Sequence, residues 1–378
     1  MTEPEAPGPL SVLLRTVQVP TAIVDSQRVL ANLTRMQTKA AESGARLRPH
    51  FKTHNSVQVG ELLRRRGVSS ITVSSIPMAI RFAAAGWTDI VIGFPLNIRT
   101  LDELAALSQV ITLGVTVDCP PALASLVERT DIECHVWIEI DTGYGRTGVP
   151  SDDDEAVLAL AAQVSSAAHL TLAGLATHAG QSYAASSLAE LREVHMTTAA
   201  AVLRLRDTLS QRGFGSVAIA IGDTPSCSAI DSFAEVDEVR AGNFLYFDQQ
   251  QLELGVCTAG DLALVIACPV VDVYPRRGQI VLHGGAVHLS KDQSRSGAFG
   301  LIAASDGFSW RVLDESVARV SSVSQEHGVI TAEPAVFRGL RVGDVALVVP
   351  AHACLAANAL GEPLLLEPDH PNSEELAS

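Results

Sequence analysis

The segment Arg-Pro-His-Phe-Lys-Thr-His at positions 48–54 places Lys52 between two histidines. It follows a strand-like run and precedes a helical one, and Pro49 disfavours helix in the residue before it, so we expect Lys52 where a strand ends. A lysine that is desolvated in a polar cavity has a lowered pKa, and its amine can then form Schiff bases with carbonyl compounds, pyridoxal phosphate included. A solvated basic turn explains the same residues equally well, so this segment alone leaves both interpretations open.

Three further groups of chemically capable residues follow predicted strands. The run DTGYGRTG at 141–148 has glycines that let the backbone turn sharply and present Arg146 to a ligand. His178 and Tyr183 follow the next strand. Residues 222–226, with Gly222 and Thr224, are small, and their backbone N–H groups suit a phosphate. A plain turn or a hydrogen-bonded core histidine would explain each group, and only their shared position at strand ends favours a site.

A possible metal site lies near the C-terminus. His352 and Cys354 stand two apart in an extended run, so their side chains point to the same side. Imidazole and thiolate together favour Zn²⁺, whereas Mg²⁺ and Mn²⁺ prefer oxygen ligands. The pair falls short of the three protein ligands usual for catalytic zinc, and two buried residues without a metal would also explain it. Water, substrate, or Glu326 and His327 are candidates for the remaining positions.

The elements that must position these groups alternate in type. Apolar strand-like runs are separated by amphipathic helical runs, which is typical of a parallel sheet buried on both faces. Eight strands in about 220 residues predict a (β/α)8 barrel, with catalytic groups where strands end. A doubly wound sheet is the alternative, but no Gly-x-Gly-x-x-Gly follows the first strand. The predicted strands cover residues 21–25, 46–50, 70–74, 89–93, 111–117, 133–140, 170–177 and 217–221.

The pattern changes near Gly255. From there on, strands without long helices, punctuated by Gly and Pro, predict a mostly β C-terminal domain. We therefore expect an N-terminal segment over 1–20 that packs on the β domain, a cofactor-binding barrel over 21–255, and a β-rich domain with the metal site over 256–378.

Composition excludes several classes of partner. The net charge of −15, with no long basic run, argues against nucleic acid and anionic membranes. No apolar stretch is long enough for a membrane span, and the acidic, proline-bearing start is unlike a signal peptide. Six scattered cysteines without a Cys-x-x-Cys pair fit reduced thiols. The sequence therefore predicts a cytoplasmic protein.

Several motifs, in the same order along nearly the whole chain, resemble the D-serine dehydratase / D-threonine aldolase family: RPHFKTH, EIDTGYGRTGV, THAGQSY, GDTPSCS, RAGNFLYFD, QEHG and PAHAC. The resemblance implies an alanine-racemase-like barrel joined to a β domain, and a homodimer. It implies that Lys52 carries pyridoxal phosphate and that Arg146 contacts its phenolic oxygen. Tyr183, Thr224, Gly242 and Asn243 would line the cofactor, with glycine-turn N–H groups on its phosphate, and His352 and Cys354 would hold the metal.

The resemblance also implies the reaction. A dehydratase would convert a small D-3-hydroxy amino acid, such as D-serine or a relative of 3-hydroxyaspartate or phenylserine, to a 2-oxo acid and ammonia, with Lys52 as the base. Cys354 favours this branch, because the aldolase branch tends to close with His-x-Asp. A retro-aldol lyase using His178, an amino-acid racemase and a non-catalytic pyridoxal-phosphate carrier remain alternatives. Ala176, Phe244 and Gln325 stand where the family often has Tyr, Tyr and Glu, which leaves the substrate side chain open.

Overall fold

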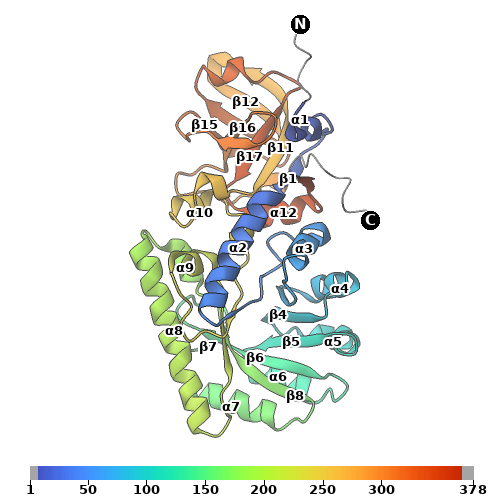
Figure 1. Cartoon of the computed structure of the whole chain (residues 1–378), viewed down its shortest axis with the longest axis vertical. Coiled ribbons are helices and arrows are strands. Elements are labelled where there is room, and N and C mark those ends of the chain that lie inside the picture. Colours follow the sequence, from blue (N-terminus) through green and yellow to red (C-terminus); the bar gives the residue numbers. More distant parts are fainter. Residues whose placement is uncertain (1–6, 368–378) are drawn as a thin grey trace. The chain divides into compact units, whose positions relative to one another are not determined.

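The computed structural model describes residues 7–367, except for the side chain of Arg338. It divides into two compact units (Figure 1). One unit comprises Leu33–Phe244. The other combines the residues up to Asn32 with those from Leu245 onward, so it is assembled from both ends of the chain.

The unit of Leu33–Phe244 is a parallel barrel, as the alternation of strands and helices predicts. Its strands follow the order β2-β10-β9-β8-β6-β5-β4-β3, and β7 is attached to β6. A parallel bridge between His50 and Thr72 joins the β2 side to β3 and closes the ring. The strands are β2 (Arg46–Leu47), β3 (Ile71–Val73), β4 (Asp89–Pro95), β5 (Thr112–Val117), β6 (Cys134–Asp141), β7 (Val149–Pro150), β8 (Leu170–Thr177), β9 (Ala218–Ile221) and β10 (Glu238–Val239).

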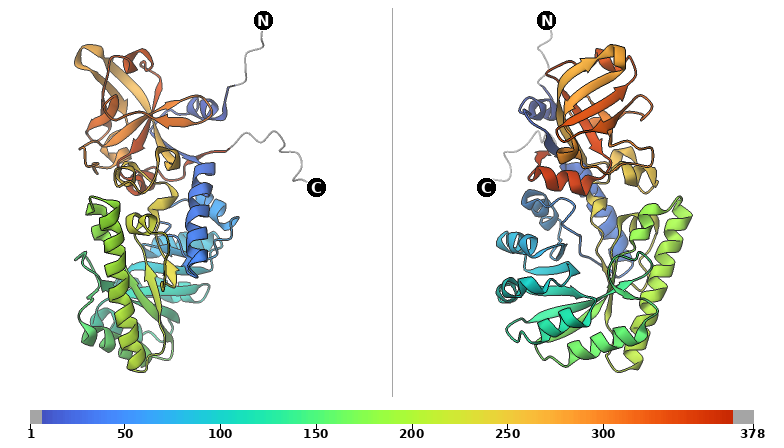
Figure 2. Two further views of the ribbon diagram at one scale, coloured as in Figure 1. Left: turned by 60° about the vertical axis from the view of Figure 1, so that its left-hand side comes forward. Right: turned by 180° about the vertical axis from the view of Figure 1, so that it is seen from behind.

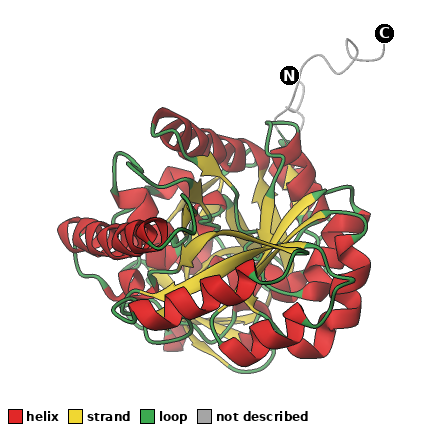
Figure 3. Cartoon of the chain, turned by 90° about the horizontal axis from the view of Figure 1, so that it is seen from below, coloured by secondary structure: helices red, strands yellow, loops and turns green. Residues whose placement is uncertain are grey.

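Helices surround these strands (Figure 3). Several begin at residues whose side-chain oxygen accepts a backbone N–H of the first turn, as Ser56, Asp153 and Ser187 do. Inside the ring, the buried side chains of Val91, Trp137, Ala176 and Ala220 form an apolar cluster that fills the barrel. The helices are α2 (Ser26–Glu42), α3 (Val57–Arg64), α4 (Ile76–Ala84), α5 (Leu101–Ser108), α6 (Pro120–Val127), α7 (Asp154–Ser165), α8 (Leu188–Gln211) and α9 (Thr224–Ala229).

One predicted barrel strand belongs elsewhere. The expected first strand, β1 (Thr21–Asp25), pairs with β11 and β18 of the other unit. The eighth barrel strand is instead β10, which has only two residues and lies between β9 and β2. The strand was therefore predicted correctly, but its place in the barrel was wrong, because the apolar composition of β1 fits an antiparallel sheet as well as a barrel.

The second unit is built on a mostly antiparallel sheet in the order β12-β16-β15-β13-β17-β11-β1-β18, with β14 on β13 and an additional pairing of β11 with β12 (Figure 2). Its strands after the barrel are β11 (Leu264–Tyr274), β12 (Gln279–His283), β13 (Gly300–Ser305), β14 (Trp310–Val312), β15 (Ala318–Val323), β16 (His327–Ala332), β17 (Val345–Pro350) and β18 (Leu364–Leu366). Its helices are α1 (Pro9–Leu14), α10 (Gln249–Glu253), α11 (Ala286–Leu289) and α12 (Ala353–Leu360).

The boundaries differ from those expected. The N-terminal segment does pack on the β unit, since the backbone N–H of Ser11 donates to Gly307 O at 3.0 Å. However, this unit also takes β1 and the start of α2, and it resumes at Leu245, not near residue 255. Residues 1–6 and 368–378 of the predicted terminal segments lie outside the described part. Among residues 7–367, no helix combines the length and apolar character needed to cross a lipid bilayer.

Candidate cofactor pocket and metal centre

A pocket in the barrel unit brings together four of the predicted site residues. Lys52, Arg146, His178 and Gly222 all line it. They come from four different loops that follow β2, β6, β8 and β9. This is the carboxyl end of parallel strands, where the sequence analysis expected chemistry to gather. The remaining lining residues are His50, Thr72, Gly93, Thr116, Glu139, Ala176, Thr177 and Arg240.

Lys52 is the one lysine that lines this pocket. The chain has three lysines, Lys39, Lys52 and Lys291. The Nζ of Lys39 is held by three backbone carbonyls of residues 227–230, at 2.6–3.2 Å. Lys291 belongs to the other unit. The side chain of Lys52 is exposed, which differs from the desolvated lysine considered in the sequence analysis, because its segment is a turn and not a buried strand.

The residues on either side hold this turn in place. Phe51 is fully buried and packs edge-on against Phe82 and Trp87, with ring centroids 4.9 Å apart in each pair. His54 packs on Phe51 at 4.4 Å, and burial lowers the pKa of His54 to about 3. Burial and the nearby charge of Lys52 also lower the pKa of His50. The two flanking histidines are therefore neutral at pH 7 and anchor the turn that carries Lys52.

His178 is a neutral histidine with a fixed tautomer. Its Nδ1–H donates to the carbonyl oxygen of Gly222, which leaves Nε2 as the basic ring nitrogen. Burial lowers the pKa of His178 to about 4; the hydrogen bond to Gly222 opposes this shift, whereas the charges of Lys52 and Arg146 add to it. At neutral pH His178 is therefore unprotonated, with the lone pair of Nε2 available, and its low pKa makes it a weak base.

The glycine-rich loop after β6 is organised by one carboxylate. Asp141 accepts the backbone N–H groups of Gly143, Tyr144 and Gly145 at 2.9–3.1 Å. Gly143 and Gly145 have φ values of +117° and +72°, which favour glycine. This turn places the guanidinium of Arg146 5.2 Å from the ring centre of Tyr144, whose ring in turn lies 5.8 Å from that of His178.

The other predicted cofactor residues lie beside the pocket without lining it. Tyr183, in η2 (Gly180–Ala184), has its ring centre 6.5 Å from that of His178. The Oγ1 of Thr224 accepts the backbone N–H of Phe244, which ties the start of α9 to η3 (Asn243–Leu245). A Cβ on Gly242 would lie 2.7 Å from His50 O, so only glycine lets this backbone approach the Lys52 segment so closely.

Asp223 serves the fold at this edge. It is buried, accepts the N–H and hydroxyl of Ser226 at 2.8 and 2.7 Å, and accepts the hydroxyl of Ser182 at 2.8 Å. Burial raises the pKa of Asp223, and these hydrogen bonds oppose that shift. Its carboxylate is therefore occupied as the cap of α9.

Sequence reasoning missed two ionisable residues of the pocket. Arg240 packs its guanidinium 4.0 Å from the ring centre of Trp137 and donates from Nε to Glu238 at 2.7 Å. Its Nη2 is buried without a hydrogen-bond partner among the described residues. Glu139 accepts the hydroxyl of Thr147 at 3.0 Å. Its Oε2 is also buried without a hydrogen-bond partner among the described residues, and burial raises the pKa of Glu139. Glu139 lies near the end of a predicted strand, which was the available signal for it, whereas Arg240 follows the two-residue strand β10, which was not predicted.

The predicted metal ligands His352 and Cys354 meet in the β unit. His352 has its Nδ1 2.6 Å from Asp292 Oδ2, and its side chain is also hydrogen-bonded to that of Cys354. A carboxylate that fixes the second nitrogen of a histidine is typical of metal sites, so the donor set fits a zinc ion. Asp292 was not foreseen in the sequence. Glu326, considered as a further ligand, instead faces His283 and His288.

The barrel with a lysine at its carboxyl end, joined to a mostly antiparallel β unit, defines an alanine-racemase-like protein, the fold type III class. The family model described as "Alanine racemase, N-terminal domain" matches residues 24–250, and the one described as "Putative serine dehydratase domain" matches residues 263–365. The chain belongs to this family, and within it to the group of D-serine dehydratases and D-threonine aldolases, as its motifs predict.

Two characterised relatives cover nearly the whole chain. D-threo-3-hydroxyaspartate dehydratase of Delftia sp. (strain HT23) is 31% identical, over 90% of this chain and 92% of the relative. Its solved structure superposes with a TM-score of 0.85 at 29% identity, covering 94% of each chain. D-serine dehydratase of Dictyostelium discoideum is 24% identical, over 91% of this chain and 92% of the relative. Alanine racemase of Corynebacterium glutamicum shares the fold, with a TM-score of 0.61 at 19% identity. The match covers 88% of this chain and 90% of the racemase.

Proposed function

We propose that this protein is a pyridoxal-phosphate- and metal-dependent lyase that dehydrates a D-3-hydroxy amino acid to a 2-oxo acid and ammonia. The observation that carries the proposal is the convergence of Lys52, Arg146 and His178 on one pocket at the carboxyl end of the barrel. The similarity to dehydratases over about nine-tenths of the chain supports elimination of water.

The pocket residues suit pyridoxal phosphate. Lys52 offers the amine for covalent attachment, and the unpaired Nη2–H of Arg240 offers a donor for the ring nitrogen. A permanently charged guanidinium partner keeps that nitrogen unprotonated. Arg146 suits the phenolic oxygen, and the glycine-bearing turns at Gly222 and Gly242, with Thr224, Asn243 and Tyr183 beside them, suit the phosphate and the cofactor's edge. When bound, the cofactor supplies an electron sink for negative charge at Cα of the substrate.

Two residues would move protons. The amine of Lys52, once free of the cofactor, removes the Cα proton of the substrate. It stands on one side of the pocket, so it reaches the proton of one enantiomer, and we propose that this is the D form. The neutral His178, with a basic Nε2, is placed to accept or return a proton near the same centre.

The metal centre supports elimination over other outcomes. His352 and Cys354, with Asp292 behind His352, suit Zn²⁺ better than Mn²⁺ or Mg²⁺, because a thiolate is a soft ligand. A mutant of the Delftia dehydratase with one cysteine replaced by alanine has been solved in a metal-free form, which supports metal use in this family. When bound, the metal supplies a Lewis acid that makes the β-hydroxyl a better leaving group.

The second candidate is retro-aldol cleavage to glycine and an aldehyde, with His178 accepting the hydroxyl proton. Its support is the neutral His178 and the 26% identity to D-threonine aldolase of Arthrobacter sp. over 90% of this chain and 86% of the relative. One assay separates the two. Purified enzyme is supplied with D-serine, D-threonine, D-threo-3-hydroxyaspartate and D-phenylserine, and with their L enantiomers. Ammonia and a 2-oxo acid in equal amounts support the proposal, and glycine with an aldehyde contradicts it.

The substrate side chain is small or anionic in this proposal. Ala176 lines the pocket where the family often has tyrosine, so that part of the wall offers no hydroxyl. The 31% identity to D-threo-3-hydroxyaspartate dehydratase supports an anionic side chain. We therefore rank D-threo-3-hydroxyaspartate ahead of D-phenylserine. Faster turnover of D-phenylserine in the same assay would reverse this order.

The proposal includes a homodimer in the cytoplasm. Alanine-racemase-like proteins set the β domain of one subunit against the barrel of the other, which is the arrangement that we propose here. An active monomer near the chain mass of 39.8 kDa in sedimentation would contradict it. A reducing compartment is supported by the six cysteines, none of which forms a disulfide in the described part of the chain.

A further inference from the structure

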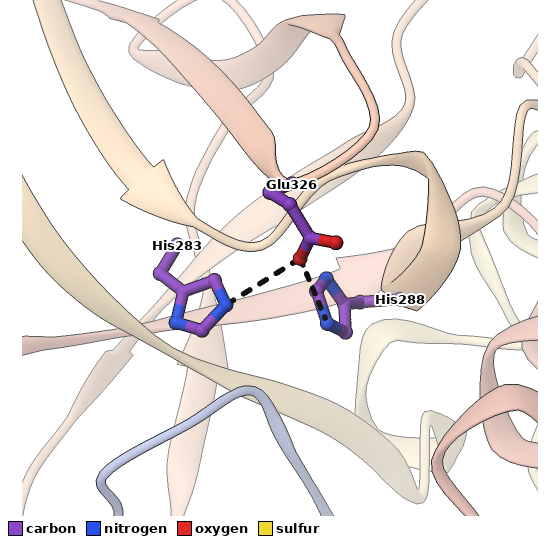
Figure 4. Close-up of side chains that lie close together, drawn as sticks. All are labelled: His283, His288 and Glu326. Carbon is purple, nitrogen blue, oxygen red and sulfur yellow. Dashed lines mark ion pairs between the residues drawn. The ribbon is translucent and has the colours of Figure 1, made fainter.

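His283, His288 and Glu326 form a cluster in the β unit that the proposed dehydratase chemistry does not use (Figure 4). One ligand atom from each residue lies within 4.8 Å of the others. The Nε2 atoms of His283 and His288 lie 3.6 and 3.7 Å from the same oxygen, Oε2 of Glu326. The two imidazole rings are nearly perpendicular, with centroids 5.4 Å apart. All three side chains thus face one point.

These distances do not suit direct bonding among the three groups. Separations of 3.6 and 3.7 Å are too long for hydrogen bonds. An ion pair would need protonated rings, but burial lowers the pKa of His288, an effect that Glu326 opposes and His283 reinforces. Ligand atoms about 2.0–2.2 Å from a tetrahedral zinc lie roughly 3.4 Å apart. The two nitrogen–oxygen separations of 3.6 and 3.7 Å are close to this value, and all three ligand atoms lie within 4.8 Å of one another.

The backbone holds the cluster together before any ion binds. Gly284 N donates to Glu326 O at 2.9 Å, Ala286 N to Ser324 O at 2.7 Å, and Val287 N to Gln325 O at 3.2 Å. These bonds tie the turn between β12 and α11 to the turn before β16. Gly285 makes this approach possible, since a Cβ there would lie 2.4 Å from Gln325 O. The three ligands lie at the end of β12, in α11 and just before β16. Because the backbone already holds these segments together, binding an ion costs little conformational entropy.

We propose that His283, His288 and Glu326 bind a divalent transition-metal ion of the zinc class, at a second metal site separate from His352 and Cys354. Two imidazoles and one carboxylate are a known zinc ligand set that leaves one position open to water. Imidazole nitrogens disfavour Mg²⁺ and Ca²⁺, which take oxygen ligands. The side chains of His283 and Glu326 are 34% and 49% exposed, so the ion and its water have a route from solvent.

The two sites have different neighbours. His352 has its Nδ1 2.6 Å from Asp292 Oδ2. His283 and His288 face Glu326 instead. The two sets share no member, so each site can be removed without deleting a ligand of the other.

Zinc content tests the proposal. Full-length protein is stripped with a chelator, equilibrated with buffered Zn²⁺ alone and measured for metal per chain. We expect about two zinc ions in the unaltered chain and about one in His352→Ala/Cys354→Ala. Adding His283→Ala/His288→Ala, or Glu326→Gln, to that variant should remove the remaining ion. The matched control is His135→Ala in the same background, because His135 is exposed and belongs to the barrel unit.

A cobalt spectrum gives a second measurement that does not depend on these variants folding equally well. Charge transfer from a thiolate to Co²⁺ can arise at the Cys354 site, whereas the His283 site supplies only nitrogen and oxygen. Titration of the unaltered protein should therefore show visible Co²⁺ bands from two sites but thiolate charge transfer from one. The proposal is overturned if His352→Ala/Cys354→Ala already removes all zinc, or if the cluster variants hold as much zinc as the His135→Ala control.

Discussion

Arg240 donates from Nε to Glu238 Oε1 at 2.7 Å, and this buried pair connects the cofactor pocket to the closing strand of the barrel. Glu238 also pairs with Arg48, 2.8 Å away, and with Arg46. Burial alone would raise the pKa of Glu238, but Arg240 and Arg48 override it and lower the pKa to about 2. Glu238 is thus ionised at every pH of interest and holds three guanidinium groups at the junction of β10 and β2.

Removing this charge should weaken the barrel. In Glu238→Gln, the buried guanidinium of Arg240 loses its counter-ion and that of Arg48 keeps only Asp89. We expect the free energy of unfolding in urea to fall by about 3–5 kcal/mol. Glu61→Gln is the matched control, because Glu61 pairs with Arg64 at the surface and should matter by less than about 1 kcal/mol. Equal losses in the two variants would show that the buried network has no special role.

Lys52 should carry the cofactor. Reduction of the yellow holoenzyme with borohydride, followed by peptide mapping, should label Lys52 among the three lysines. Lys52→Ala should be colourless and lose activity by more than about 10³-fold, since both the attachment point and the base for the Cα proton are gone. Lys291→Ala is expected to stay yellow. A label on Lys39 or Lys291 would contradict the assignment.

Asp292 should act through His352. In Asp292→Asn, the group that orients the ring of His352 is weakened, so we expect zinc affinity at this site to fall by about 10–100-fold. Competition with a zinc-binding dye measures the change. Glu333→Gln, which alters an exposed carboxylate of the same unit, serves as control. Unchanged affinity in Asp292→Asn would mean that His352 is oriented without it.

Removal of metal should stop elimination without releasing the cofactor. Chelated enzyme should stay yellow, because Lys52 belongs to the barrel unit and His352 and Cys354 to the other. Dehydration should fall by at least about 10²-fold, while exchange of the substrate Cα proton with deuterium from solvent, followed by NMR, continues. Full dehydratase activity after chelation would reduce the metal to a structural role.

Stability should decrease in mild acid because several histidines are buried in the neutral form. Burial lowers the pKa of His195 to about 4 and that of His54 to about 3. The unfolded chain, with histidine pKa values near about 6.5, binds more protons below that pH, so the stabilisation is complete above about 6.5 and is lost as the pH falls toward 4.

His195→Gln tests this dependence at a residue outside the pocket. The difference in the free energy of unfolding between pH 7 and pH 5, measured in urea, should shrink in this variant, because the protonation of His195 contributes up to about 3 kcal/mol over the full range. Identical pH profiles for the unaltered protein and His195→Gln would contradict the prediction.

Local sequence signals predicted the barrel well where the elements are long. The predicted strand over 170–177 coincides with β8, and the one over 111–117 starts one residue before β5. They failed at β10, because a two-residue strand whose Glu238 is buried by distant arginines has no apolar run to detect. They also placed Glu326 and His327 among the candidates for completing the site of His352 and Cys354. Glu326 instead faces His283 and His288, a contact that depends on the pairing of β12 with β16.

The two neighbours of β1 lie far along the chain, since Thr21 pairs with Ala267 and Val24 pairs with Leu365. This affects the order in which the parts of the protein can fold during synthesis. A ribosome delivers β1 first, yet both strands that flank it emerge only after the entire barrel. Because most neighbouring strands of the barrel are close in sequence, the barrel can fold while synthesis continues. Until residues 364–366 are translated, β1 keeps an apolar sheet edge exposed, and such edges invite pairing with other chains. The nascent polypeptide is most in need of chaperone protection during this interval.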